Sequence, residues 1–224
     1  LVENIQFVDI EGPSLAGVID KTIYSVAMEE TRFNLSGVYV EKVEYEGDLS
    51  LRLVSTDGHR LNMASLMTAD LPSLELPRGV LISKKGLAEL KRLADGAEMI
   101  KLGVSSNSLV AKTDTATLVM RLLDGRFPDY NMVIPKDNNK HITAGRKELL
   151  DALKRISTMS SDDYKAVKFK IESGLLTISS LTPELGNAAD GLAVEYEGET
   201  METGFNPRFS IEAVSALAHS HAKI

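Results

Sequence analysis

The sequence contains no cysteine, which excludes disulfide bonds, thiolate catalysis and zinc sites built on cysteine. It has no apolar stretch long enough to span a membrane. No basic segment followed by an apolar segment opens the chain, as a secretory signal would. These absences predict a cytoplasmic protein without a membrane partner.

Motifs that carry catalysis or phosphate binding are missing as well. The sequence has no glycine-rich phosphate loop, no G-x-S-x-G elbow and no H-E-x-x-H motif. His219 and His221 form an H-x-H pair, but residues two apart on a helix point in different directions and cannot converge on a metal. His141 stands alone beside a predicted strand. We therefore expect no metal, no cofactor and no catalytic residues.

What the sequence does contain is regular hydrophobic patterning. In four segments apolar residues recur three and four positions apart, which predicts helices. These segments are Ser14–Met28, Lys85–Leu93, Arg146–Ile156 and Pro207–Leu217. Alternating or β-branched runs predict strands at Gly37–Val43, Leu49–Ser55, Met99–Val104, Thr115–Leu122, Val167–Glu172, Leu175–Ser180 and Leu192–Tyr196. The predicted class is α+β, with helices packed on antiparallel sheet.

The order of these elements repeats along the 224 residues. Each copy runs strand, helix, strands, helix, and the period of roughly 125 residues predicts tandem homologous domains. The boundary falls in Asp124–Asn139, which is rich in proline, aspartate and asparagine. The second copy stops after its second helix, so we expect it to lack the counterpart of Met99–Leu122. Because the chain starts at Leu1 rather than methionine and its second copy is unfinished, we expect both ends of the natural protein to lie outside it.

The distribution of charge qualifies the net charge of −7, which by itself argues against nucleic acid. Three of the four helical segments carry a positive balance. Lys85 and Arg92 project opposite the apolar stripe of their helix, and Lys147 and Lys154 do the same on theirs. These faces are either solvated surfaces or surfaces that follow a phosphate backbone without reading sequence.

The segment STDGHRL at 55–61 follows an apolar strand, so its Asp-Gly pair predicts a tight turn. One interpretation makes Asp57 and His59 an acid/base or metal pair, but no third ligand or nucleophile has matching spacing. The alternative is a turn with polar groups facing solvent.

STDGHRL at 55–61, RLLDGRFPDYNMVIP at 121–135 and TRFNLSGV at 31–38 resemble the β subunit of the bacterial replicative DNA polymerase, the sliding clamp family. GFNPRF at 204–209 resembles a segment of the family's third domain, and the resemblance runs essentially end to end. It implies tandem DNA-clamp domains with antiparallel sheets outside and paired helices lining the inner face. Residues 1–127 match the second of three domains, and 128–224 match the third without its C-terminal strands.

The function that the resemblance implies is non-catalytic. Two subunits join head to tail into a ring that encloses duplex DNA without reading its sequence. The ring tethers the replicative polymerase and so serves as a processivity factor. The implied partners are the polymerase catalytic subunit, the ATP-driven clamp loader, translesion polymerases and repair proteins, which dock through a short hydrophobic motif.

The resemblance also implies three sets of functional residues. The peptide-docking set, in a groove between the second and third domains, is Arg32, Leu35, Thr56, Gly58, His59, Arg60, Leu61, Pro128, Val133, Asn206 and Phe209. The DNA-contacting set is Lys84, Lys85, Arg92, Lys147, Lys154 and Arg155. The subunit-interface set is Thr158 and Met159. The chain departs from the family pattern at Phe209, where tyrosine is common, and at Asn34, where an aromatic residue is common.

Two other functions compete with this one. The chain could form a peptide-binding module that does not encircle DNA, or a hydrolase that uses Asp57 and His59.

Overall fold

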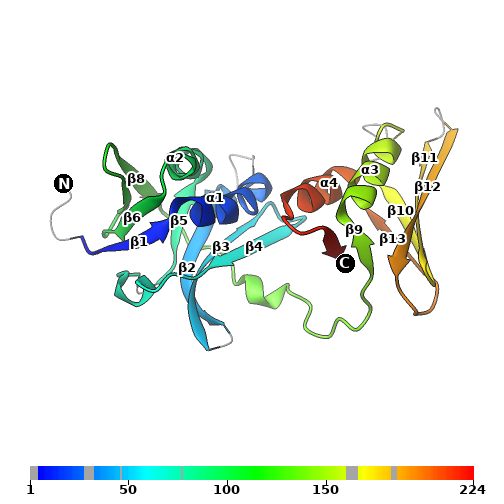
Figure 1. Cartoon of the computed structure of the whole chain (residues 1–224), viewed down its shortest axis with the longest axis horizontal. Helices are drawn as coiled ribbons and strands as arrows, with labels where there is room; N and C mark the ends of the chain where they lie inside the picture. Colours follow the sequence, from blue (N-terminus) through cyan, green and yellow to red (C-terminus); the bar gives the residue numbers. More distant parts are fainter. Residues whose placement is uncertain (1–4, 28–32, 46, 77, 160–165, 183–185) are drawn as a thin grey trace. The chain divides into compact units, whose positions relative to one another are not determined.

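The structure, a computed structural model, describes residues 5–27, 33–45, 47–76, 78–159, 166–182 and 186–224. The chain forms two compact units, Leu1–Asp129 (unit 1) and Tyr130–Ile224 (unit 2). Each unit has its own hydrophobic core. Both follow the order strand, helix, strands, helix that the sequence repeat predicts, and in both at least one further strand comes after the second helix (Figure 1).

Unit 1 is an antiparallel sheet covered by two helices. The sheet has the strand order β1-β6-β7-β8-β5-β2-β3-β4. Its strands are β1 (Phe7–Glu11), β2 (Gly37–Tyr45), β3 (Asp48–Thr56), β4 (Leu61–Leu66), β5 (Val80–Ser83), β6 (Met99–Val104), β7 (Ser108–Lys112) and β8 (Thr117–Leu123). The helices are α1 (Gly12–Asp20) and α2 (Lys84–Asp95), with short 3-10 turns η1 (Ile23–Ser25), η2 (Phe33–Leu35) and η3 (Leu71–Ser73).

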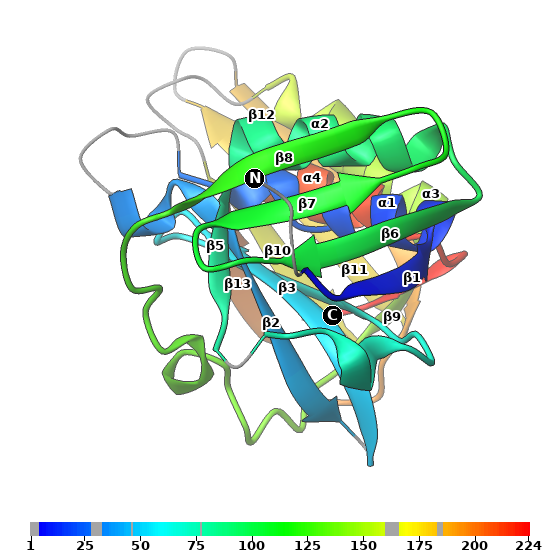
Figure 2. The ribbon, with the colours of Figure 1, turned by 90° about the vertical axis from the view of Figure 1, so that its left-hand side faces the viewer.

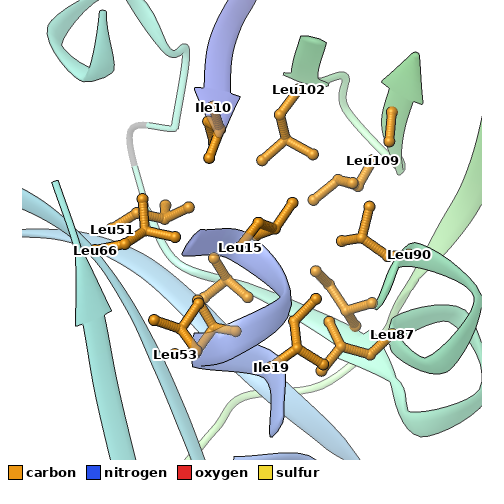
Figure 3. Packing of buried hydrophobic residues seen from close by; sticks show 14 of the residues in the cluster. Ile10, Leu15, Ile19, Leu51, Leu53, Leu66, Leu87, Leu90, Leu102 and Leu109 are labelled. Carbon is orange, nitrogen blue, oxygen red and sulfur yellow. The ribbon is translucent and has the colours of Figure 1, made fainter. Parts of the chain in front are cut away.

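The core of unit 1 lies between the helices and the sheet. The helices contribute Leu15, Ile19, Leu87 and Leu90, whose spacing of three and four residues keeps them on the buried stripe. Figure 3 shows these side chains meeting Leu51, Leu53, Leu66, Ile10, Leu102 and Leu109 from the strands. Figure 2 looks onto β6, β7 and β8, with α1 and α2 behind them. Both helices therefore have an inner face in the core and an outer face available to solvent.

Helix α1 ends earlier than the sequence pattern predicts. The Thr22 hydroxyl donates to the carbonyl oxygens of Val18 (2.9 Å) and Ile19 (3.2 Å), and the chain turns there into η1. A threonine that bonds back to the previous turn competes with helix continuation. The predicted helix to Met28 is thus wrong beyond Asp20, and Met28 itself lies outside the described residues.

Unit 2 has the strand order β13-β10-β11-β12-β9-β14. Its strands are β9 (Thr143–Gly145), β10 (Val167–Glu172), β11 (Leu175–Thr182), β12 (Gly186–Glu195), β13 (Met201–Phe205) and β14 (His221–Lys223). Its helices are α3 (Arg146–Ser157) and α4 (Pro207–Ala216), and a 3-10 turn, η4 (Tyr130–Met132), precedes them. Leu149, Leu153 and Ile156 of α3 pack with Phe169 and Ile178 of the sheet in its core.

The C-terminal segment corrects two expectations. Leu217 has an extended backbone, so α4 ends at Ala216 and His221 lies in a strand rather than on a helix. That strand, β14, pairs with β9 as β6 pairs with β1 in unit 1. Unit 2 therefore contains a counterpart of the first part of Met99–Leu122, which we expected it to lack entirely.

No helix in the described ranges is long and apolar enough to cross a membrane.

Candidate partner-docking turn and basic helix faces

The STDGHRL segment forms the turn between β3 and β4. Thr56 closes β3 opposite Leu61 of β4. Gly58 has φ of 90°, a backbone conformation that glycine adopts without strain. The Thr56 hydroxyl accepts from the Gly58 N–H (3.0 Å) and donates to the Arg60 carbonyl oxygen (2.6 Å). The prediction of a tight turn here is confirmed.

The Asp57 carboxylate organises the tip of this turn. Its Oδ1 accepts from the N–H groups of His59 (3.0 Å) and Arg60 (3.1 Å), and its Oδ2 lies 3.0 Å from Arg60 Nε. Burial alone would raise the pKa of Asp57, but the His59 N–H, the Arg60 guanidinium and the Arg60 N–H together lower it below the usual aspartate value. Both carboxylate oxygens are therefore engaged within the turn, which argues against a catalytic role for Asp57.

Arg60 connects the turn to η1. Its Nη2 donates to the Tyr24 carbonyl oxygen (3.0 Å), and its guanidinium carbon lies 5.2 Å from the centre of the Tyr24 ring. The side chain of Arg60 is only 14% exposed. The charged group expected at a peptide-docking surface thus points into the protein.

Buried hydroxyl groups also join the end of β3 to segment 22–25, through the residue that precedes Thr56. Ser55 Oγ donates to the Thr22 carbonyl oxygen (2.5 Å) and lies 2.6 Å from Ser25 Oγ. Thr22, Ser25 and Ser55 are all fully buried. Buried hydroxyl groups that find partners stabilise one arrangement of the segments they connect.

Leu35 comes to the same end of the sheet through η2. It lies two residues before the start of β2, and Tyr39 of β2 pairs with Val54 of β3. The start of β2 therefore lies beside the end of β3, where the turn at 55–61 begins. Leu35 is largely buried, and its carbonyl oxygen accepts from the Ala27 N–H (3.1 Å).

The DGRFPDY segment approaches this region through Gly125 and Phe127. Gly125 has φ of 133°, and a Cβ there would lie 4.0 Å from Asn34 Cα. Phe127 is buried and stacks on Tyr39, with ring centres 5.1 Å apart and an angle of 1° between the ring planes. A side chain at Gly79 would overlap the Tyr39 ring. This stacking holds Phe127 against β2 and leaves the neighbouring Pro128 exposed.

Unit 1 thus brings together Leu35, the turn residues from Thr56 to Leu61, and the segment that carries Pro128. Tyr24, Tyr39 and Phe127 support them, although none belongs to the predicted set. Phe127 lies inside the DGRFPDY segment, which the sequence singles out. Nothing in the sequence, however, indicates that its ring stacks on Tyr39.

The remaining predicted docking residues belong to unit 2 or lie outside the described residues. Val133 is 68% exposed. Asn206 caps α4 by accepting from the Arg208 N–H (3.0 Å), and Phe209 is half-buried on the same helix. All three belong to unit 2, and Arg32 lies outside the described residues.

The predicted DNA-contacting residues lie on α2 and α3 and differ in their surroundings. Lys85, Lys147 and Lys154 are exposed, and within the described ranges they form no ion pair. Arg92 pairs with Glu89, and Arg155 Nη2 lies 2.6 Å from Asp190 of β12. Lys84 is half-buried at the start of α2. The outer faces of α2 and α3 therefore present three lysines that form no ion pair with any residue the structure describes.

Thr158 is the C-cap of α3, and Met159 follows it. The Thr158 hydroxyl donates to the Arg155 carbonyl oxygen (2.7 Å), and the Met159 N–H donates to the Ile156 carbonyl oxygen (3.1 Å). Thr158 is exposed and Met159 is half-buried.

In the part of the chain that the structure covers, no group of three histidine, aspartate or glutamate side chains could hold a metal ion. His59 is exposed at the tip of the turn, and His221 Nδ1 lies 3.0 Å from Ser220 Oγ.

Comparison with known families covers both units. The model of the DNA polymerase III beta subunit central domain matches residues 9–129, and that of its C-terminal domain matches residues 131–224. The chain belongs to the DNA polymerase III beta subunit family.

Relatives of this beta subunit family support the assignment. The chain is 36% identical to the beta sliding clamp of Caulobacter vibrioides over 215 residues, which is 96% of this chain and 57% of the relative. It is 35% identical to the beta sliding clamp of Escherichia coli K12 over 202 residues, 89% of this chain and 53% of the relative. The chain thus spans just over half the length of the curated relatives it matches.

Solved structures of beta clamps agree with the fold. A Caulobacter crescentus beta sliding clamp with bound polyethylene glycol superposes with a TM-score of 0.91 at 34% identity. A Bartonella birtlesii sliding clamp bound to griselimycin has a TM-score of 0.90 at 31% identity. Each comparison covers 100% of this chain and 60% of the solved chain.

Proposed function

We propose that the protein carrying this chain is a DNA sliding clamp, in which units 1 and 2 serve as the second and third domains. The observation that carries the proposal is the match of both units, in order, to the two beta subunit domain models. Two subunits would close into a ring around duplex DNA, with Thr158 and Met159 at the subunit interface. The protein would act in the cytoplasm as a processivity factor without chemistry of its own.

Enclosure changes what the DNA-facing surface has to do. A closed ring holds DNA topologically, so its helices need only weak, salt-sensitive phosphate contacts that permit sliding. The exposed lysines of α2 and α3 suit this role, because an ammonium group contacts phosphate without reading base sequence. The net charge of −7 does not oppose it, since an acidic remainder directs DNA toward the basic faces.

The DNA contact is tested by charge reversal in the protein at its natural length. Lys85→Glu with Lys154→Glu should shorten retention on closed circular DNA. Removing one phosphate-binding lysine should reduce the slope of log affinity against log salt by about 0.9. Lys168→Glu with Lys170→Glu, two changes on β10, is the matched control and should leave retention unchanged. Unaltered retention in the α2/α3 variant would favour a peptide-binding module that does not encircle DNA.

The docking turn is proposed as the site for partner peptides. A polymerase, clamp loader or repair protein tethered there gains effective concentration at the primer end, which yields processivity. Gly58 permits close approach of a peptide backbone, while Leu61 and Pro128 offer apolar surface for a hydrophobic anchor. Val133, Asn206 and Phe209 stay predicted members of the docking set.

Calorimetry with a peptide of the Gln-Leu-x-Leu-Phe type tests this assignment. Leu61→Ala with Pro128→Ala should weaken binding about tenfold or more, because interface anchors each contribute over about 1 kcal/mol. Met99→Ala with Val119→Ala removes two apolar side chains that are 46% and 50% exposed, and it serves as the control. Equal affinity of the docking variant and the control would refute the assignment.

The hydrolase alternative predicts metal-dependent turnover that His59→Ala abolishes. The engaged Asp57 carboxylate favours the docking function instead.

A further inference from the structure

The guanidinium group of Arg60 is engaged by other groups of unit 1. Its Nε lies 3.0 Å from Asp57 Oδ2, and its Nη2 donates to the Tyr24 carbonyl oxygen at 3.0 Å. The Tyr24 ring covers the guanidinium at 5.2 Å. With 14% of its side chain exposed, Arg60 has little surface left to offer a bound peptide.

The geometry of the turn depends on this arrangement. Asp57 holds the N–H groups of His59 and Arg60 with one carboxylate oxygen, and with the other it orients the Arg60 guanidinium. The guanidinium then fixes the turn to the Tyr24 main chain. The end of β3, the start of β4 and η1 are thereby connected. Gly58 and His59, in the same turn, remain exposed.

The connection has a second, independent component. Ser55, the residue before the turn, bonds to the Thr22 carbonyl oxygen and lies against Ser25. Segment 22–25 is therefore held from both Ser55 and Arg60. A turn held at two points loses little conformational freedom when a ligand binds, and such preorganisation raises affinity.

We propose that Asp57 and Tyr24 are positioning residues of the docking turn, and that Arg60 acts on a bound peptide through them rather than by contact. The proposal rests on the docking function proposed above. It adds two residues to the site and changes the role that family resemblance implies for Arg60.

A double-mutant cycle distinguishes positioning from contact, using the protein at its natural length and the Gln-Leu-x-Leu-Phe-type peptide. Asp57→Ala and Arg60→Ala should each weaken binding about tenfold, and the double variant should bind no more weakly than either. Asp57→Asn keeps an acceptor for the two N–H groups and should recover part of the affinity. Asp114→Ala, in the β7–β8 turn, is the matched control.

A second measurement reports on the turn without the peptide. Amide exchange at Gly58 and His59 should accelerate in Asp57→Ala and in Tyr24→Leu, remain slow in Tyr24→Phe, and be unchanged in Asp114→Ala. Tyr24→Phe retains the aromatic ring and the main-chain acceptor, so it should bind the peptide more tightly than Tyr24→Leu does.

The outcomes separate the two proposals. If the unmodified protein does not bind the peptide, the docking function fails, and this inference fails with it. If the unmodified protein binds but the Asp57 and Arg60 effects add, Arg60 contacts the peptide directly and the positioning role is overturned. Binding by Asp57→Ala with unmodified affinity and unmodified exchange would overturn it as well.

Discussion

In each unit the start of the first helix packs against the end of the second helix, and we call this contact the helix junction. Units 1 and 2 form it in opposite ways. In unit 1 the N–H of Gly12 at the start of α1 donates to the Glu98 carbonyl oxygen (2.8 Å), just beyond α2. A Cβ at Gly12 would overlap the carbonyl oxygens of Ala94 and Ala97. In unit 1 the two segments can therefore meet because residue 12 is a glycine and has no side chain.

Unit 2 uses a long side chain at the equivalent place. The N–H of Arg146 at the start of α3 donates to the Ser220 carbonyl oxygen (2.8 Å). Its guanidinium donates to the carbonyl oxygens of Val214 (3.0 Å) and Ser215 (2.8 Å) at the end of α4. A cation at a helix C-terminus satisfies carbonyl groups that lack helical partners. The repeat thus preserves the junction between elements while the residues that make it differ.

The largest expected effect breaks the junction of unit 1. Gly12→Ala places a methyl group against two main-chain oxygens and should destabilise unit 1 by about 3 kcal/mol. Hydrogen exchange resolved by unit, with Ile10 and Leu102 reporting on unit 1, measures it. Gly17→Ala is the matched control, because a Cβ at Gly17 meets nothing within 4 Å and alanine favours the helix. Equal stability of the two variants would contradict the steric argument.

A smaller effect is expected from the junction of unit 2. Arg146→Ala leaves the end of α4 without its charged donor and should destabilise unit 2 by about 2 kcal/mol. The same exchange experiment, read at Leu149 and Phe169, reports it. Arg208→Ala removes an arginine whose partner Glu212 lies on the same exposed helix face, and such pairs contribute about 0.5 kcal/mol or less. A destabilisation that spread equally to unit 1 would argue against a local capping role.

The smallest effect concerns the docking turn of unit 1 in acid. The folded-state pKa of Asp57 is lowered, so its stabilisation is present above the unfolded-state pKa of about 3.9 and is lost as the pH falls through the folded-state pKa. The stability difference between the unmodified protein and Asp57→Asn should be constant near neutral pH and shrink under acid. Denaturant titrations of both proteins across that range measure it. A difference that stayed constant into strong acid would mean that Asp57 is not held as a carboxylate.

Much of the fold follows from local patterning. The three- and four-residue spacing of leucines locates α2 and α3 to within about one or two residues, the usual uncertainty of helix ends. The helix that begins near Ser14 is the exception, because Thr22 satisfies the preceding carbonyls and ends α1 early. The hairpins β6–β7 and β10–β11 turn at Ser105–Asn107 and Glu172–Gly174, whose residue types favour tight turns.

The candidate site likewise has features that local sequence predicts and features that it does not. The Asp-Gly pair predicts the turn, since a left-handed residue is required there and glycine supplies it. Nothing local indicates that Arg60 reaches Tyr24, that Phe127 stacks on Tyr39, or that Arg155 meets Asp190. Helical periodicity shows that Lys154 faces outward, but only the neighbouring strand β12 decides that Arg155 is paired with Asp190, whereas Lys154 has no ion-pair partner among the described residues.

The sequence by itself determined the two-copy order of elements, the outward basic faces and the position of the turn at 55–61. These properties depend on residue type and on spacing within a few positions. The tertiary structure decided which helix charges pair with a described neighbour, how α1 and α3 abut the ends of their partner helices, and what holds the turn at 55–61 on η1. These depend on pairs far apart in the chain, such as Arg60 with Tyr24, which meet only after the sheet and helices have packed.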